Sequence, residues 1–208
     1  EGAKKAGFPV RIMHAHNTRL PRDKKLPVKL FCKQFLPGAA TDYWACGREA
    51  GLYYFGPRRW TERGVVIHNA IDLSRFGYRP EVRTRLRAEY HLENKLVVGN
   101  VARFMAQKNH TRLLDIFAQI RAQHPESCLL LVGDGELRAE LEEKTARLGL
   151  ADSVIFLGAQ ADTSVWYQVM DVFVMPSLFE GLPVVGIEAQ AAGLPCLFSD
   201  AVTDEVLL

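Results

Sequence analysis

The chain has 208 residues, 48% of them hydrophobic and 24% charged, which is the composition of an ordinary globular protein with one large or two small domains. No apolar run approaches the roughly 20 residues that a membrane-spanning helix needs, and the first residues do not read as a secretory signal. The net charge is +2, but residues 1–90 hold 18 Lys and Arg against 8 Asp and Glu, whereas residues 91–208 hold 8 against 16. This asymmetry indicates two functional surfaces.

The first third of the chain alternates weakly between strand-like and helix-like segments. The expected strands are residues 9–14, 42–46 and 64–68, and the expected helices are residues 26–36 and 48–54.

From residue 95 onward the alternation is strict. Buried parallel strands are predicted at 97–102, 128–133, 154–158, 172–176 and 195–199, and helices at 109–123, 136–149, about 162–170 and 183–192. The first of these helices is expected to have an apolar face of Leu113, Leu114, Phe117 and Ile120, and the second a face made mostly of Leu137, Leu141 and Leu148. This order predicts an α/β fold with a doubly wound parallel sheet, whose ligands bind outside the carboxyl ends of the strands. Candidate ligand-binding residues fall at or just past these ends: Arg103, Gly133, Gly135, Gly158 and Glu180.

Glu188 is a carboxylate in a helix that is otherwise apolar nearly all round. Pro183 suits the first turn of this helix and Gly193 suits the residue just past its end. Such a helix is expected to be buried, and a buried carboxylate is costly unless it is hydrogen-bonded. No Lys or Arg follows Arg147, so a local ion pair does not explain Glu188. We interpret Glu188 as an acceptor for ligand hydroxyl groups.

Glu180 and Glu188 enclose seven residues, and four further motifs precede them in order. These are Val66–Asp72 with Phe76, Val98–Arg103 with Lys108, Leu131–Glu136 and Val154–Gly158. The set resembles the family-four retaining glycosyltransferases (glycosyl transferases group 1), which have the B-type two-domain fold. Arg11–Asn17 and Cys46–Gly51 resemble the exopolysaccharide-assembly subgroup. Five ordered motifs are far more specific than one glycine loop.

The resemblance implies two Rossmann-like domains. Residues 1–77 are expected to be a partial N-terminal, acceptor-side domain with its linker, and residues 78–208 a partial C-terminal domain that binds the nucleotide-sugar donor. We expect truncation at both ends, because the family's opening strands, its glycine-rich acceptor loop and its closing helices have no counterpart here. Residues 1–208 are therefore expected to bind a nucleotide weakly but to transfer no sugar.

The resemblance also implies roles for single residues. Glu180 is expected to face the donor sugar and Glu188 to hold the nucleotide ribose. Arg103 and Lys108 are expected to stabilise the charge that the diphosphate leaving group gains. Asn109 follows Lys108 where the family usually has glycine, and asparagine suits a helix cap.

Further positions are implied in the same way. The family commonly has a histidine at the end of the strand that carries His14 and His16, where it reaches the donor; we favour His14. A zinc site at this pair would need further ligands, so no metal is expected. Nucleotide binding is expected to involve Gly133, Gly135, Gly158, Gly181, Leu182 and Pro183.

The activity implied is transfer of a hexosyl unit, with retention, from a nucleotide diphosphate sugar to a glycan or lipid-linked hydroxyl acceptor. The expected donor is a UDP-sugar, the expected pathway is synthesis of exopolysaccharide or capsule, and no cofactor is required. Two alternatives stay open: a B-fold sugar-nucleotide 2-epimerase, and a non-catalytic nucleotide-sugar-binding domain. Product formed without acceptor favours the first, and binding without turnover favours the second.

The segment from Arg19 to Lys33 holds six cations and one anion, with Leu26, Leu30 and Phe31 among them. This pattern predicts a basic amphipathic helix that contacts an anionic membrane, with a solvated basic face as the equal alternative. No recognised nucleic-acid motif accompanies the cluster, so no nucleic-acid partner is expected.

The four cysteines, Cys32, Cys46, Cys128 and Cys196, are widely spaced and form no CxxC pair. They are expected to be reduced, packed thiols. We therefore expect a cytoplasmic location, at the inner face of the membrane if the basic segment binds lipid.

Overall fold

The computed structural model describes residues 2–20 and 24–207, which belong to two compact units. Unit 1 contains the chain up to Ala70 together with Phe179–Pro183 and Ala201–Leu207. Unit 2 contains Ile71–Leu178 and Val184–Asp200. Residues 21–23, part of the predicted basic segment, lie outside the described residues.

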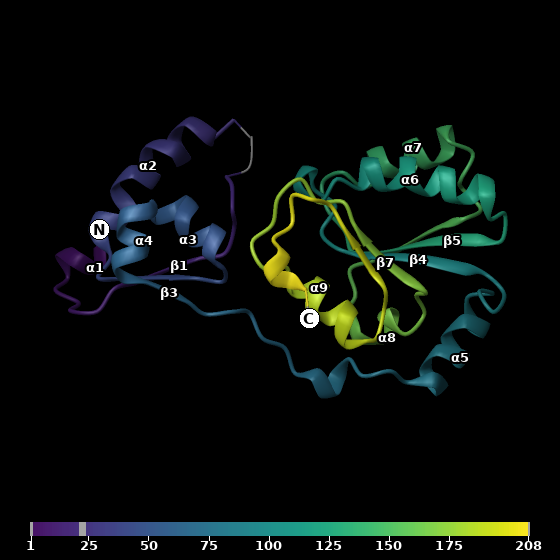
Figure 1. Ribbon diagram of the computed structural model, residues 1–208. Coiled ribbons are helices and arrows are strands. Elements are labelled where there is room, and N and C mark those ends of the chain that lie inside the picture. Colours follow the sequence, from purple (N-terminus) through teal and green to yellow (C-terminus); the bar gives the residue numbers. More distant parts are fainter. Residues whose placement is uncertain (1, 21–23, 208) are drawn as a thin grey trace. The chain divides into compact units, whose positions relative to one another are not determined.

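Unit 1 is built on a three-stranded parallel sheet in the order β1-β2-β3. Its elements are α1 (Gly2–Lys5), β1 (Ile12–Ala15), α2 (Leu26–Ala39), β2 (Asp42–Ala45), α3 (Arg48–Phe55), α4 (Pro57–Arg63) and β3 (Gly64–Val66). Figure 1 shows α2, α3 and α4 over one face of this sheet. Tyr43, Phe55 and Trp60 are buried there, with the Phe55 ring 4.9 Å from Tyr43 and 6.0 Å from Trp60 between centroids.

The three strands and two helices predicted for this region are confirmed, but each strand is shorter than predicted and the first begins three residues later. Helix α4 is not predicted from the sequence. Gly56 has a φ of +76°, which turns the chain between α3 and α4, and Pro57 then begins the second helix.

Unit 2 contains a five-stranded, all-parallel sheet in the order β6-β5-β4-β7-β8. The strands are β4 (Leu96–Val101), β5 (Ser127–Val132), β6 (Val154–Gly158), β7 (Val172–Met175) and β8 (Cys196–Phe198). Each lies within two residues of its predicted bounds. The predicted doubly wound parallel sheet is confirmed.

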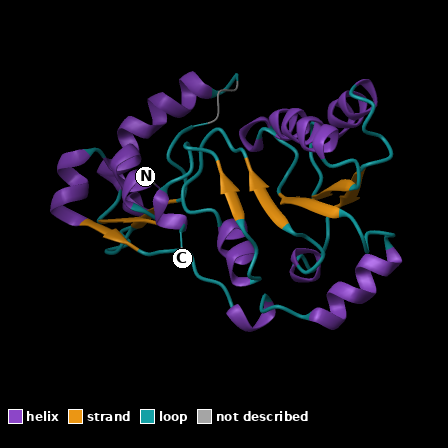
Figure 2. Cartoon of the chain, turned by 45° about the vertical axis from the view of Figure 1, so that its right-hand side comes forward, coloured by secondary structure: helices purple, strands orange, loops and turns teal. Residues whose placement is uncertain are grey.

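The helices of unit 2 cover both faces of its sheet. They are α5 (Pro80–Glu89), α6 (His110–Gln123), α7 (Arg138–Arg147), α8 (Ser164–Tyr167) and α9 (Val184–Ala191). Unit 2 also has 3₁₀ turns at Leu73–Arg75 and Ala106–Lys108, whereas the 3₁₀ turn at Asp204–Val206 belongs to unit 1. Figures 1 and 2 show α6 and α7 on one face and α5, α8 and α9 on the other. Helix α5 is not predicted, and α8 is shorter than expected.

The core under α6 and α7 follows the predicted apolar faces, with one exception. Leu113, Leu114, Phe117 and Leu141 are almost fully buried. Leu148, predicted to share the apolar face of α7, instead follows the end of the helix and is 38% exposed. No helix among the described residues has the length and apolarity needed to cross a membrane.

Candidate functional site

The strand order of unit 2 reverses between β4 and β7, so the helices that follow these two strands lie on opposite faces of the sheet (Figure 2). Ligands of an open parallel sheet bind at such a switch point, outside the carboxyl ends of the strands. The loop after β4 is tied to the loop after β5 by a bond from Phe104 N to Asp134 O (2.9 Å). A bond from Leu178 N to Gln107 O (2.8 Å) ties it to the loop after β7.

The loop after β4 carries Arg103 and Lys108. Lys108 is half-buried at the end of the 3₁₀ turn that precedes α6. The Arg103 side chain is 70% exposed, and its Nη2 lies 3.2 Å from Glu136 Oε2. Helix α6 begins just after Lys108, so the partial positive charge of its N-terminus lies at the same edge as this lysine. The side chain of Asn109 does not cap the first N–H groups of the helix. An anion is the ligand that such an arrangement favours.

Asn109 adopts a left-handed conformation with a φ of +55°. Glycine and asparagine enter this region most readily, so asparagine suits this position as glycine would. Asn109 occupies the predicted cap position, but its side-chain Nδ2 instead donates to Pro176 O at 3.2 Å. The start of α6 is thereby fixed to the end of β7.

His110 and Asn100 form a buried pair beneath this loop that sequence reasoning missed. His110 Nε2 lies 3.0 Å from Asn100 Oδ1, and Asn100 Nδ2 donates to Val174 O at 2.7 Å. Burial, and then the charge of Lys108, lower the pKa of His110 to about 4, so the ring is neutral near pH 7. The sequence signal for this pair was Asn100, an amide side chain inside the otherwise apolar strand β4.

Gly133 and Gly135 are required by the packing of one loop on another. A Cβ atom on Gly133 would lie 2.0 Å from Ala102 O, and one on Gly135 would lie 2.4 Å from Phe104 O. Both contacts are impossible, because the neighbouring atoms belong to the backbone. Gly158 has a φ of +73°, and its carbonyl accepts from Gly133 N at 2.9 Å. These glycines let the loops after β5 and β6 reach the edge beside the loop after β4.

Glu188 lies half-buried on α9, and no ion pair to it is found among the described residues. Its Oε2 accepts a hydrogen bond from the Tyr167 hydroxyl at 2.6 Å. One hydroxyl bonded to Glu188 therefore comes from the chain itself, whereas the sequence predicted hydroxyl groups of a ligand. The helix is buried at Ile187 and Ala189, but Val184 is 37% exposed, so α9 is not buried all round.

His14 and His16 lie in unit 1, and their ring centroids are 4.1 Å apart. Both side chains are exposed, and the His14 and Trp44 rings are nearly perpendicular, with their centroids 6.1 Å apart. Burial, and then the charge of His16, lower the pKa of His14. The His14 imidazole is therefore less readily protonated than an ordinary histidine side chain.

The loop that carries Glu180 is held within unit 1 by three hydrogen bonds. Thr18 Oγ1 donates to Glu180 O at 2.6 Å, Asn69 Nδ2 donates to Leu182 O at 2.6 Å, and Leu182 N donates to Cys46 Sγ at 3.3 Å. Glu180 is only 5% exposed. The loop therefore has a defined backbone conformation.

The sequence-predicted residues divide between the two units. Unit 2 contains Arg103, Lys108, Gly133, Gly135, Gly158 and Glu188, and unit 1 contains His14, Glu180, Gly181, Leu182 and Pro183. A Cβ atom on Gly181 would lie 2.2 Å from His16 O, so this glycine is required by packing within unit 1. The candidate site is the carboxyl edge of the unit 2 sheet.

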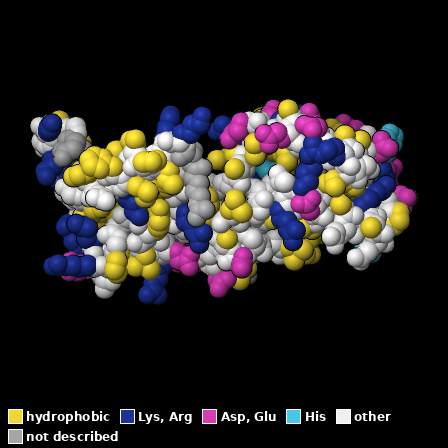
Figure 3. Space-filling model, turned by 90° about the horizontal axis from the view of Figure 1, so that it is seen from above, with side chains coloured by type: hydrophobic (Ala, Val, Ile, Leu, Met, Phe, Trp, Pro, Cys, Tyr) yellow, Lys and Arg dark blue, Asp and Glu magenta, His cyan; other side chains and the backbone are white. Residues whose placement is uncertain are grey.

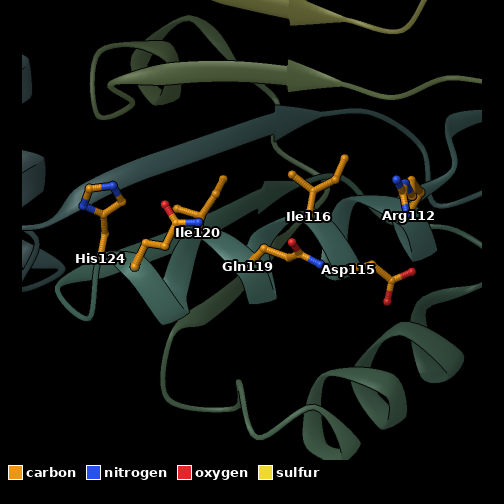
Figure 4. Close-up of a pocket in the computed structure, with 7 residues that line it drawn as sticks. Arg112, Asp115, Ile116, Gln119, Ile120 and His124 are labelled. Atoms are coloured by element: carbon orange, nitrogen blue, oxygen red, sulfur yellow. The ribbon is translucent and has the colours of Figure 1, made fainter.

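A surface groove of about 300 Å³ lies along α6 rather than at this edge (Figure 4). It is lined by Arg112, Asp115, Ile116, Gln119, Ile120, Gln123 and His124. None of the predicted residues lines the groove, and it has no helix N-terminus or glycine loop, so we place the site at the sheet edge. Within residues 2–20 and 24–207, no group of three or more His, Cys, Asp or Glu is placed to hold a metal ion.

Residues 82–204 match the family model "Glycosyl transferases group 1". The chain is 39% identical over 210 residues to EpsF of Bacillus subtilis (strain 168), whose name describes it as a glycosyltransferase; the match covers 98% of the chain and 54% of EpsF. It is 30% identical to the Escherichia coli enzyme named UDP-Gal:alpha-D-GlcNAc-diphosphoundecaprenol alpha-1,3-galactosyltransferase, over 95% of the chain and 53% of that enzyme. The chain spans about half the length of these relatives.

The fold is similar to that of Anabaena Alr3699/HepE, whose crystal structure holds UDP and glucose. The TM-score is 0.81 at 25% identity, and the match covers 95% of the chain and 55% of HepE. The predicted B-type fold is confirmed by this likeness.

Proposed function

The chain belongs to the glycosyl transferases group 1 family, and from this premise we propose that the whole protein is a retaining hexosyltransferase. It takes the sugar from a nucleotide diphosphate sugar, with UDP as the nucleotide, and transfers it to a hydroxyl of a glycan or lipid-linked acceptor. The reaction serves synthesis of an exopolysaccharide or capsule. Binding of UDP by HepE and the lipid diphosphate acceptor named for the E. coli relative support this assignment.

The observation that carries the proposal is the start of α6 at the switch point of the unit 2 sheet. A helix N-terminus without a side-chain cap, with Lys108 just before it and Arg103 on the same loop, is suited to a diphosphate. The diphosphate gains negative charge as the glycosidic bond breaks, and fixed positive groups stabilise this charge in the transition state.

The remaining residues take the following roles in the proposal. Glu188 holds the nucleotide ribose, Glu180 faces the donor sugar, and His14 contacts the donor. The acceptor oxygen bonds to the anomeric carbon on the face from which the diphosphate leaves, and its proton passes to a leaving phosphate oxygen. Configuration is retained in this step without an enzymatic nucleophile, a metal ion or a cofactor.

The test is an assay of the whole protein with UDP-glucose or UDP-galactose, with and without a lipid diphosphate acceptor. Glycoside formed with the α configuration of the donor supports the proposal. Epimerised nucleotide sugar without acceptor, or binding without any turnover, contradicts it. A thermal-shift screen of UDP, GDP and ADP tests the base, because a ligand that binds the folded protein raises its melting temperature.

Glu188→Ala is expected to weaken UDP binding by on the order of 1–3 kcal/mol, the usual contribution of a hydrogen bond to a charged group. Isothermal titration calorimetry measures this change. Glu188→Gln is the matched variant, because its amide oxygen still accepts from Tyr167 while the charge is removed. Unchanged UDP affinity in a folded Glu188→Ala protein contradicts the ribose assignment.

Helix α2 supports the further proposal that the enzyme binds an anionic membrane surface. Val28, Phe31 and Phe35 are 64%, 64% and 58% exposed, and their spacing places them on one face of α2. Figure 3, which looks down on this helix, shows hydrophobic side chains gathered over it. Lys33, predicted among the membrane-facing cations, instead lies 3.5 Å from the centroid of the Tyr53 ring. The exposed face of α2 is therefore apolar, with Lys24 and Lys25 exposed before its start.

This surface, and four cysteines that form no disulfide, favour a cytoplasmic enzyme at the inner face of the membrane. Phe31→Ser with Phe35→Ser is expected to reduce sedimentation with vesicles of acidic lipid at least tenfold, because each buried Phe contributes about 1.5–3 kcal/mol. Binding of the native protein is expected to fall as salt rises. Leu73→Ser removes a 61% exposed leucine elsewhere and is the control. Equal sedimentation of all variants contradicts membrane contact through α2.

A further inference from the structure

Tyr167 is buried in the core of unit 2, at the end of α8. It is 1% exposed, and its ring centroid lies 6.0 Å from those of Phe76 and Phe173. The next residue, Gln168, fixes the end of α8 to the start of α5, because its Oε1 accepts from Arg79 N at 2.8 Å. The position of the Tyr167 hydroxyl is therefore set by packing on several sides.

The single hydroxyl proton of Tyr167 has two neighbouring acceptors. Glu188 Oε2 lies 2.6 Å away, whereas Val185 O lies at 3.4 Å, so the proton is donated to the carboxylate. Burial, and then the charge of Glu188, raise the pKa of Tyr167, which keeps the phenol protonated. A short hydrogen bond from a neutral donor to a carboxylate belongs to the stronger class of protein hydrogen bonds.

This bond leaves much of the carboxylate available. An ionised carboxylate accepts at about four lone-pair positions, and the described residues occupy one of them. Glu188 is half-buried rather than fully buried, so part of its side chain is open to a ligand. The two adjacent hydroxyls of a ribose can donate hydrogen bonds to the lone pairs of Glu188 that remain available.

We infer that Tyr167 is a positioning residue, which holds the Glu188 carboxylate in the orientation that receives the two ribose hydroxyls of the donor nucleotide. This inference rests on the proposed function. Without the phenol hydroxyl, Glu188 can rotate about its side-chain bonds, and this freedom must be lost again when the ribose binds. Tyr167 thus acts on the nucleotide through Glu188.

The test measures binding of UDP and 2′,3′-dideoxy-UDP to the whole protein by calorimetry. Tyr167→Phe keeps the ring and removes only the hydroxyl. It is expected to weaken UDP binding roughly 5- to 10-fold and to leave binding of the dideoxy nucleotide unchanged, since that ligand has no ribose hydroxyls to receive. Tyr167→Phe added to Glu188→Ala is expected to have no further effect on UDP binding.

Tyr90→Phe is the matched control, because Tyr90 packs on Trp166 and its hydroxyl makes no hydrogen bond in the described part of the chain. Its affinity for both nucleotides is expected to equal that of the native protein. An equal loss for both nucleotides in Tyr167→Phe, or no loss, overturns the inference. If native protein prefers UDP over the dideoxy form and only Glu188→Ala removes this preference, the proposed function stands without a role for Tyr167. Absence of binding to UDP, GDP and ADP by the native protein overturns both.

Discussion

In the whole enzyme, Lys108→Ala is expected to lower kcat with a UDP-sugar donor by about 10²–10³-fold, the usual effect of removing one preorganised group that stabilises transition-state charge. Lys108 lies at the carboxyl edge of the sheet, just before the N-terminus of α6. The backbone of the loop that carries it is held by the bond between Leu178 N and Gln107 O, so the loop needs little rearrangement during the reaction. Steady-state rates across donor concentrations separate kcat from KM.

Arg103→Ala is expected to lower kcat less, because the Arg103 side chain is 70% exposed and forms an ion pair with Glu136. The matched control is Arg147→Ala, which removes a 62% exposed cation from α7, paired there with Glu143. A rise in KM with unchanged kcat in Lys108→Ala contradicts leaving-group stabilisation, because it means that the lysine binds the ground state and the transition state equally.

The sheet of unit 2 was predictable because its strands are buried on both faces. Such strands read as continuous apolar runs, and β5 (Ser127–Val132), which is buried at every position, is the clearest example. Helix α5 was missed because its sequence is strongly polar, and its Arg87 is buried through hydrogen bonds that no local pattern reveals. Leu148 was misplaced because α7 ends one residue before it.

The positions of the candidate site were predictable for a related reason. A doubly wound sheet places every loop after a strand at one edge, so Arg103 and Lys108 can be assigned to that edge from topology alone. The partners beneath them were not predictable. Tyr167 meets Glu188 across 21 residues, and Asn100 meets Val174 across 74, so these contacts exist only through tertiary packing.

Asp171→Asn is expected to reduce the free energy of unfolding of unit 2 by about 3–5 kcal/mol, the usual cost of removing one partner from a buried ion pair. Asp171 Oδ2 lies 3.1 Å from Arg87 Nη1 and accepts from Val97 N at 2.8 Å, and Arg83 pairs with Oδ1. The Arg87 side chain is 8% exposed, so its charge has little access to water once the carboxylate is gone. Denaturant titration with amide exchange of β4 and β5 peptides reports unit 2 alone.

The matched control for this variant is Asp162→Asn. Asp162 pairs with Arg75 at 3.4 Å, but both side chains are more than half exposed, so the loss is expected to be below about 1 kcal/mol. Equal losses for the two variants contradict the view that burial of Arg87 sets the cost. Arg87→Met removes the buried cation instead and leaves Asp171 with Arg83 and Val97.

The stabilisation by Asp171 is also expected to depend on pH in a defined direction. Burial by itself raises the pKa of Asp171, but the hydrogen bonds from Val97 N, Arg83 and Arg87 together outweigh burial and lower it. A carboxyl with a lowered pKa contributes stability above its unfolded pKa of about 3.9, and this contribution is lost as pH falls through the folded pKa. The difference between native protein and Asp171→Asn is therefore expected to be full from about pH 5 to pH 7 and to shrink below about pH 4. A difference that grows as the solution is acidified contradicts this assignment, because it means that the carboxyl is bound in its protonated form.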